Sequence, residues 1–189
     1  KAQTGAVSDI RPCIKDNQGC IGRINQSKTL GCILNPEVGY EGSIKDSARV
    51  KAQHSKKVMV VGAGPAGLEA ARVASEKGHD VTIYDGQKTV GGQVKLASKG
   101  AGRENMHTIA IFLADMVYKR NIPVKTGTVV DKELVLTEKP DVVVIATGSK
   151  PIEKPYPGVY EPPFVLNVSQ VLENSHPVGK KVLFTNLKK

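Results

Sequence analysis

The sequence predicts an α/β fold of the Rossmann type, preceded by a segment with little regular structure. Residues 1–50 contain many glycines and prolines and almost no hydrophobic periodicity. After residue 56, apolar strands alternate with amphipathic helices, and the first strand runs into the sequence Gly-Ala-Gly-Pro-Ala-Gly at 62–67. A strand followed by a glycine-rich turn and a helix is typical of a parallel sheet that binds a dinucleotide.

The predicted elements after residue 56 form a βαβ series. The apolar runs before Gly62 and before Gly148 suit strands that are covered on both faces. Apolar residues at helical spacing ahead of Gly78 predict a helix that ends at this glycine, and a second apolar stripe predicts a helix packed on the sheet. In chain order, we expect strands at 57–61, 81–85, 123–126 and 141–147, and helices at 66–77 and 104–120.

The glycine-rich turn carries the signal for nucleotide binding. Its first glycine permits the tight bend, its second lets the backbone approach a diphosphate, and its third lets helix and strand pack closely. These positions are Gly62, Gly64 and Gly67, and Asp85 ends the next strand, where an acid can accept hydrogen bonds from ribose hydroxyls. Because Asp85 would repel a 2′-phosphate, we expect FAD, ADP or NAD rather than NADP. The alternative is that the glycines only form a tight turn.

Three cysteines and an aspartate precede the predicted sheet, with the spacing Cys13-x2-Asp16-x3-Cys20-x11-Cys32. A compact ligand set with one distant member is how a loop encloses a four-iron cluster, whereas zinc sites usually have paired CxxC sequences, which this chain lacks. A carboxylate is a harder ligand than a thiolate, so Asp16 predicts one labile iron. Two alternatives are that the cysteines hold no metal and that Asp16 only caps a turn.

The composition limits the environment and the partners of the chain. With 189 residues it can bury one core of ordinary size but cannot hold a whole multi-cofactor enzyme. Residue 1 is lysine rather than methionine, so we expect a processed chain or a piece of a longer protein. No apolar stretch suits a membrane helix, and three free cysteines suit a reducing compartment, so a cytoplasmic location is expected. The net charge of +9 comes from scattered lysines, which we interpret as solvated surface rather than a nucleic-acid site. The alternative is that the charge favours an acidic partner subunit or the phosphates of a nucleotide.

Several motifs occur in the order found in a known family. They are Asp9–Ile14, Asn17–Cys20, Cys32 with Asn35–Gly39, Val61–Ala71, Gly91–Gln93 and Ala146–Gly148. Together they resemble the C-terminal half of the 2,4-dienoyl-CoA reductase, enoate reductase and trimethylamine dehydrogenase family, iron–sulfur flavoenzymes with an old-yellow-enzyme barrel. The resemblance implies a Rossmann-like FAD/NAD(P)-binding domain preceded by a loop-rich iron–sulfur cluster-binding segment.

The resemblance also implies which residues hold the cofactors. Cys13, Cys20 and Cys32 would bind a 4Fe-4S cluster. Asp16 stands where the family has its second cysteine, because Lys15-Asp16 replaces the usual Gly-Cys pair. The adenosine diphosphate portion of FAD would be held by Gly62, Gly64, Pro65, Ala66, Gly67 and Asp85. Gly92, Gln93 and Arg103 would line the flavin site, Val130 would approach the adenine, and Ala146, Thr147 and Gly148 would close over the cofactor.

In this family an N-terminal barrel binds FMN and does the substrate chemistry, the cluster lies at the junction, and a nicotinamide domain follows the FAD or ADP domain. The barrel is absent from this sequence, so FMN and NAD(P)H are expected on missing domains or on partner chains, in a hetero- or homo-oligomer. We expect an iron–sulfur segment at 1–50 and an FAD- or ADP-binding domain at 51–150. A linker and the first strand of an incomplete nicotinamide-binding domain are expected at 151–189.

The expected function is electron transfer within a multi-cofactor flavin oxidoreductase. No residue of this chain need act as acid, base or nucleophile, because the cofactors carry the chemistry and the protein tunes them. One alternative is a non-catalytic nucleotide-binding scaffold that has lost its cluster. A third interpretation, a zinc-stabilised nucleic-acid binder, predicts a colourless protein.

Overall fold

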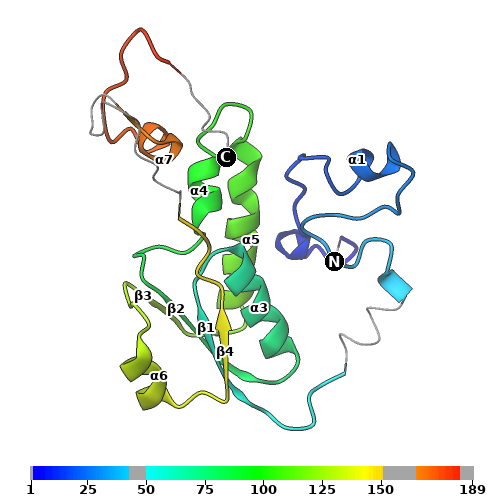
Figure 1. The fold of residues 1–189 in the computed structure, drawn as a ribbon. Helices are drawn as coiled ribbons and strands as arrows, with labels where there is room; N and C mark the ends of the chain where they lie inside the picture. Colours follow the sequence, from blue (N-terminus) through cyan, green and yellow to red (C-terminus); the bar gives the residue numbers. More distant parts are fainter. Residues whose placement is uncertain (1, 43–49, 151–164, 184–189) are drawn as a thin grey trace. The chain divides into compact units, whose positions relative to one another are not determined.

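The computed structural model in Figure 1 describes residues 2–42, 50–150 and 165–183. The chain divides into two units, Lys1–Gly148 and Ser149–Lys189. The first unit contains the α/β fold that the sequence predicts.

In its described part, the second unit contains the short helix α7 (Val168–Leu172). This helix begins with a capping box, in which the side chains of Asn167 and Gln170 each accept a hydrogen bond from the other residue's backbone N–H. Residues 180–183, where we expect the first strand of a further domain, pair with no strand of the described residues. Residue 184 lies outside the described residues.

The sheet of the first unit has four parallel strands in the order β3-β2-β1-β4. These strands are β1 (Lys57–Val61), β2 (Asp80–Asp85), β3 (Val124–Thr126) and β4 (Val142–Ile145). All four strands predicted from the sequence are thus confirmed. Because β2 and β4 flank β1 on opposite sides, the carboxyl end of β1 lies where the strand order reverses, the place where open α/β sheets bind ligands.

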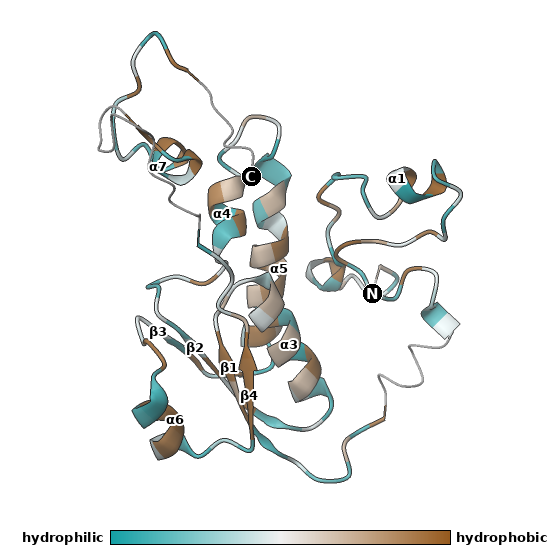
Figure 2. Ribbon diagram, in the orientation of Figure 1, coloured by the Kyte–Doolittle hydropathy of each residue, from teal (hydrophilic) through white to brown (hydrophobic). Residues whose placement is uncertain are grey.

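Two long helices cover one face of this sheet and form the core with it (Figure 1). They are α3 (Pro65–Glu76) and α5 (His107–Tyr118), which confirm the two predicted helices, the second being preceded by the 3-10 turn η2 (Glu104–Met106). Val60, Leu68, Ile83, Leu113 and Val117 are fully buried between helices and sheet. Figure 2 shows hydrophobic residues along β1 and β4 and on α5.

The shorter helices were not expected from the sequence. They are η1 (Val7–Asp9), α1 (Ile21–Ile24), α4 (Gln93–Ala97) and α6 (Lys132–Glu138). Helix α6 begins at Asp131, whose side chain accepts from Leu134 N–H at 2.8 Å. It is attached to β1 and β3 because Glu138 pairs with Lys57 at 3.1 Å and with Lys125 at 3.2 Å.

The expectation that the strand ahead of Gly148 is covered on both faces is wrong for the described residues. In β4, Val143 is 38% exposed and Ile145 is 79% exposed. The reason is position: β4 is the last strand of the sheet and pairs only with β1 among the described strands. A continuous apolar run therefore indicates that both faces of a strand can be buried, but the neighbouring elements determine how much of each side chain is buried.

The turn between β1 and α3 is tightly packed. Gly62 has φ +111°, and a Cβ built on it would lie 2.2 Å from the carbonyl oxygen of Ala146. A Cβ on Gly67 would lie only 1.8 Å from the carbonyl oxygen of Gly62. Glycine is therefore required at both positions, because strand and helix backbones meet there with no room for a methyl group.

We predict that Gly67→Ala destabilises the protein by about 1–3 kcal/mol, since α3 must move away from β1 to admit the methyl group. The measurement is the urea unfolding midpoint of the intact protein, followed by circular dichroism. Gly179→Ala is the control, because a Cβ at Gly179 has no atom within 4 Å and its φ is not positive. Equal midpoints for the two variants would contradict this account of the turn.

Candidate functional site

The N-terminus of α3 is the candidate binding site for an anion. Gly64 is its N-cap and Pro65 occupies its first turn, and no side chain of the described residues caps it. The free N–H groups of a helix N-terminus and the helix dipole favour a negatively charged group such as a diphosphate. The structure thus places Gly62, Gly64, Pro65, Ala66 and Gly67 in one strand–turn–helix, as the sequence predicts.

A second glycine loop lies against this turn. The N–H of Gly91 donates to the carbonyl of Ala63 at 2.8 Å. A Cβ on Gly92 would lie 3.0 Å from the Cα of Gly64, so two stretches of backbone face each other with no side chain between them. Such a bare backbone surface fits a pyrophosphate that must approach the chain closely. Gln93 follows directly as the first residue of α4.

Asp85 lies at the end of β2 with its carboxylate directed at the turn. Its Oδ2 accepts from the N–H of Ala63 at 2.5 Å, and its Oδ1 accepts from the N–H of Gln87 at 2.7 Å. The carboxylate therefore holds the turn in shape, a structural role that the sequence did not reveal. Each oxygen has a further lone pair, so a bond from a ribose hydroxyl is compatible with this arrangement and stays a prediction.

Two more predicted segments adjoin the ends of β1 and β2. The N–H of Ala146 donates to Val61 at 2.8 Å, which brings the run Ala146, Thr147 and Gly148 to the end of β1. The N–H of Thr128 donates to the backbone carbonyl of Asp85 at 2.9 Å, so the loop that contains Val130 adjoins Asp85. Arg103 is the N-cap of η2, where its N–H donates to Gly100, and its place in a flavin site stays a prediction.

The N-terminal segment carries the candidate metal ligands. All three thiols are free, with Cys13 and Cys32 exposed and Cys20 half-buried. The backbone around Cys20 packs closely on that around Cys32, because a Cβ on Gly19 would lie 2.9 Å from the Cα of Cys32. The N–H of Gly31 also donates to Gly19 at 2.9 Å. The fold therefore brings two of the three cysteine positions together.

Asp16 is the unusual residue of this segment. Its neighbours Lys15 and Asn17 both have φ +61°, which makes a tight loop around it. Its Oδ2 is buried and has no hydrogen-bond partner, although burying an unpaired carboxylate oxygen is unfavourable. This oxygen therefore caps no turn. A carboxylate oxygen is a type of donor that metal ions accept.

The donor chemistry of the segment fits an iron–sulfur cluster, but the side chains are not gathered into one site. Three free thiols and one unpaired carboxylate oxygen are the types of donor that iron accepts. Among the described residues, however, no three His, Cys, Asp or Glu side chains form a group that could hold a metal ion. The iron–sulfur segment predicted from the sequence is therefore not shown by the structure.

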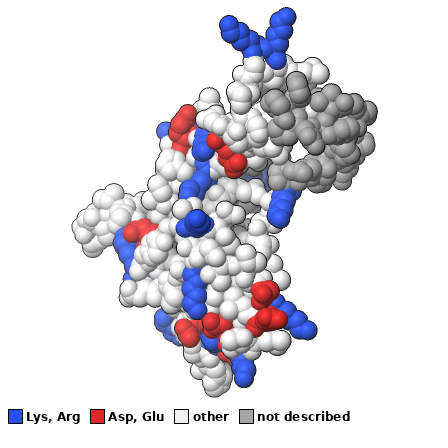
Figure 3. Space-filling model, turned by 90° about the vertical axis from the view of Figure 1, so that its left-hand side faces the viewer, with Lys and Arg blue, Asp and Glu red and all other residues white. Residues whose placement is uncertain are grey.

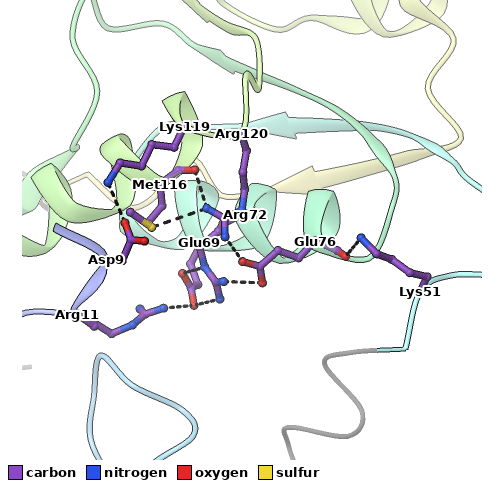
Figure 4. Close-up of polar contacts among 9 residues, drawn as sticks. All are labelled: Asp9, Arg11, Lys51, Glu69, Arg72, Glu76, Met116, Lys119 and Arg120. Atoms are coloured by element: carbon purple, nitrogen blue, oxygen red, sulfur yellow. Dashed lines mark hydrogen bonds and ion pairs between the residues drawn. The ribbon is translucent and has the colours of Figure 1, made fainter. Parts of the chain in front are cut away.

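The sequence does not predict one network of charged residues that the structure contains. A continuous chain of ion pairs runs from the N-terminal segment across α3 to the residues just after α5 (Figure 4). It consists of Arg11, Glu69, Arg72, Glu76 and Arg120. Within α3 the spacing of Glu69, Arg72 and Glu76 is a recognisable helical signal. The contact of Arg11 with Glu69 joins residues 58 positions apart, and no local pattern predicts it.

The distribution of charge on the surface and the limited hydrophobicity of the helices are as the composition suggests. On the face in Figure 3, basic and acidic side chains are interspersed, without a large patch of one sign among the described residues. None of the described helices has the length and apolar character needed to cross a membrane.

Comparison with known proteins supports the family resemblance. Residues 56–181 match the family model described as pyridine nucleotide-disulphide oxidoreductase. The chain is 35% identical over 184 residues to a bilirubin reductase of Mediterraneibacter gnavus, a match that covers 97% of this chain and 28% of that protein.

Solved structures show the same relationship. The chain resembles a 2-naphthoyl-CoA reductase with a TM-score of 0.82 and 38% identity, covering 95% of this chain and 27% of the other. It also resembles the histamine dehydrogenase of Rhizobium sp. 4-9 with a TM-score of 0.74 and 28% identity, covering 94% and 27%. The chain thus spans about a quarter of the length of these relatives. The chain belongs to the flavoenzyme family of enoate reductases, 2,4-dienoyl-CoA reductases and trimethylamine dehydrogenase, with a pyridine nucleotide-disulphide oxidoreductase domain.

Proposed function

We propose that this chain is the nucleotide- and cluster-binding part of a larger flavin oxidoreductase, relaying electrons between FAD and an FMN-bearing barrel through a 4Fe-4S cluster. The observation that carries the proposal is the pair of bare glycine backbones at the N-terminus of α3, where Gly64 faces Gly92. A segment with three free thiols and an unpaired carboxylate oxygen is attached to the same helix. Because the chain belongs to a family of oxidoreductases, we infer that both features serve a redox reaction.

The residues of the turn would bind and orient the dinucleotide. The N–H groups at the start of α3 would meet the diphosphate, and Gly64 and Gly92 would let it approach the backbone. Asp85 would accept from a ribose hydroxyl while it holds Ala63, and Val130 would approach the adenine. Gln93, Arg103 and residues 146–148 would enclose the flavin end. Bound FAD would supply the exchange of electrons with a nicotinamide.

The N-terminal segment would hold the cluster through Cys13, Asp16, Cys20 and Cys32. A bound cluster would supply transfer of single electrons, and the protein would set its environment through charges and hydrogen bonds to the ligands. Asp16 would supply the one oxygen donor, which is consistent with its unpaired buried Oδ2. No acid, base or nucleophile from this chain is required for this role.

The rest of the protein would carry the substrate chemistry. Because the chain spans about a quarter of its relatives, we propose that an FMN-binding barrel and a nicotinamide-binding domain lie on other parts of the same protein or on partner chains. Free thiols suited to metal favour a reducing, cytoplasmic compartment.

A second candidate function is a nucleotide-binding scaffold without a cluster. It is favoured by one observation, that the described residues contain no ready group of three metal-binding side chains. The visible spectrum of the intact protein separates the two functions. Broad absorbance in the blue that is bleached by dithionite supports the relay, and a spectrum of nucleotide alone supports the scaffold.

We predict that Asp85→Ala weakens FAD binding by ~1–3 kcal/mol, the contribution typical of a hydrogen bond to a charged group. The measurement is a titration of FAD into the intact protein after the flavin has been removed. Asp80→Ala is the matched control, because Asp80 is an exposed residue at the opposite end of the same strand. Unchanged affinity in Asp85→Ala would remove this residue from the site.

We predict that mild oxidation releases one iron from the native protein and leaves a three-iron cluster, whereas Asp16→Cys retains four irons, because a thiolate binds iron more covalently than a carboxylate. Paramagnetic resonance and iron analysis follow the loss. Lys28→Cys is the control, since it adds a thiol at an exposed position of the same segment. If the native and Asp16→Cys proteins lose iron at the same rate, Asp16 is not a ligand.

A further inference from the structure

Arg11 makes one contact within the N-terminal segment and two contacts with the nucleotide-binding fold. Figure 4 shows its pair with Glu69. One guanidinium nitrogen donates to the carbonyl of Leu34 at 2.8 Å, and another donates to Oε1 of Glu69 in α3 at 2.9 Å. The guanidinium also lies 5.2 Å from the ring centroid of Phe112 in α5, within the range of a cation–π contact. The Arg11 side chain is only 17% exposed, so these contacts are screened little by water.

Arg11 and its partner Leu34 lie next to the first and the last cysteine of the sequence. Arg11 stands two residues before Cys13, and Leu34 stands two residues after Cys32. The bond between Arg11 and Leu34 therefore closes the segment that contains every candidate ligand. The bond to Glu69 then fixes this closed segment on α3.

The partner of Arg11 is itself held in place. Arg72 donates two bonds to the Glu69 carboxylate, both at 2.9 Å, and a third to Glu76 at 2.6 Å. Burial raises the pKa of Glu69, but the hydrogen bonds and charges of Arg72 and Arg11 outweigh it and hold this pKa below its usual value. Glu69 thus offers Arg11 a fixed, ionised carboxylate rather than a mobile one.

Further contacts hold the same segment without metal. Lys119, the C-cap of α5, pairs with Asp9 at 2.9 Å and donates to the hydroxyl of Ser8 at 2.7 Å. Ile14 and Leu34 pack against the hydrophobic core. Two polar contacts and two apolar side chains therefore fix this segment to the end of α5 and to the core.

We propose that Arg11 is a positioning residue that fixes the ends of the cysteine segment on α3, and with them any cluster that the segment holds. This inference rests on the proposed function for its purpose. Glu69 lies four residues after Pro65, the first residue of α3, which corresponds to ~6 Å along the helix axis. The same helix therefore presents its N-terminus to the nucleotide site and one of its first side chains to the cysteine segment.

The test is hydrogen exchange of the intact protein after metal has been removed with a chelator. Arg11→Gln should speed exchange in residues 9–15 about tenfold or more, as expected when a hydrogen bond between charged groups is lost. Arg11→Lys should restore much of the protection, because an ammonium group can still pair with Glu69. Arg23→Gln is the matched control: it removes the same charge from the segment, but the Arg23 side chain donates to the Thr29 carbonyl, within the same segment.

A second variant and a second readout complete the experiment. Glu69→Gln should give the same increase as Arg11→Gln, and the double variant should give no more, because the two residues act as a pair. In protein that retains iron, Arg11→Gln should broaden the paramagnetic resonance signal of the reduced cluster, and Arg23→Gln should leave it unchanged.

The outcomes separate this inference from the proposed function. The role of Arg11 would be overturned if residues 9–15 of Arg11→Gln exchanged at the same rate as in the unmodified protein. It would also be overturned if Arg11→Gln and Arg23→Gln had equal effects on these residues. A protein without iron would overturn the proposed relay, while the exchange data would still decide whether Arg11 fixes the segment.

Discussion

The constraint on which the rest of the structure depends is the contact between the Gly62 carbonyl and Gly67. With a Cβ position only 1.8 Å from that oxygen, no other residue fits at Gly67, and α3 is pressed directly against the end of β1. This contact sets the direction of α3 and brings its N-terminus to the place where the strand order reverses. Asp85, Gly92 and Ala146 all meet the turn there.

Helix α3 is the common support of both proposed sites. No side chain of the described residues caps its N-terminus, where the backbones of Gly64 and Gly92 face each other. Its residue Glu69 forms an ion pair with Arg11 of the cysteine segment. A displacement of α3 would therefore alter the nucleotide site and the cysteine segment together. Under the proposed function, this shared support would keep two cofactors at a constant separation.

Most of the nucleotide-binding fold could be predicted from the sequence, because its signals are local. The strands, the glycine turn and the helices α3 and α5 follow from hydrophobic period and from Gly62, Gly64 and Gly67. The exposure of β4 could not be predicted, since it depends on which strands lie beside it. The bond between Arg11 and Glu69 spans 58 residues, and the bond of Asp85 to Ala63 depends on side-chain direction at the end of β2. Helix α6 was missed although Asp131 is a good N-cap and Pro140 follows its end, because seven residues give a weak periodic signal.

The central claim is that one helix supports a nucleotide site at its N-terminus and a metal site beside its first turns. The most direct test is a crystal structure of the intact protein with anomalous diffraction measured on both sides of the iron absorption edge. The account predicts iron among Cys13, Asp16, Cys20 and Cys32, with the Arg11–Glu69 pair intact and a diphosphate at the N-terminus of α3. Zinc in place of iron, or iron bound away from these residues, would contradict it.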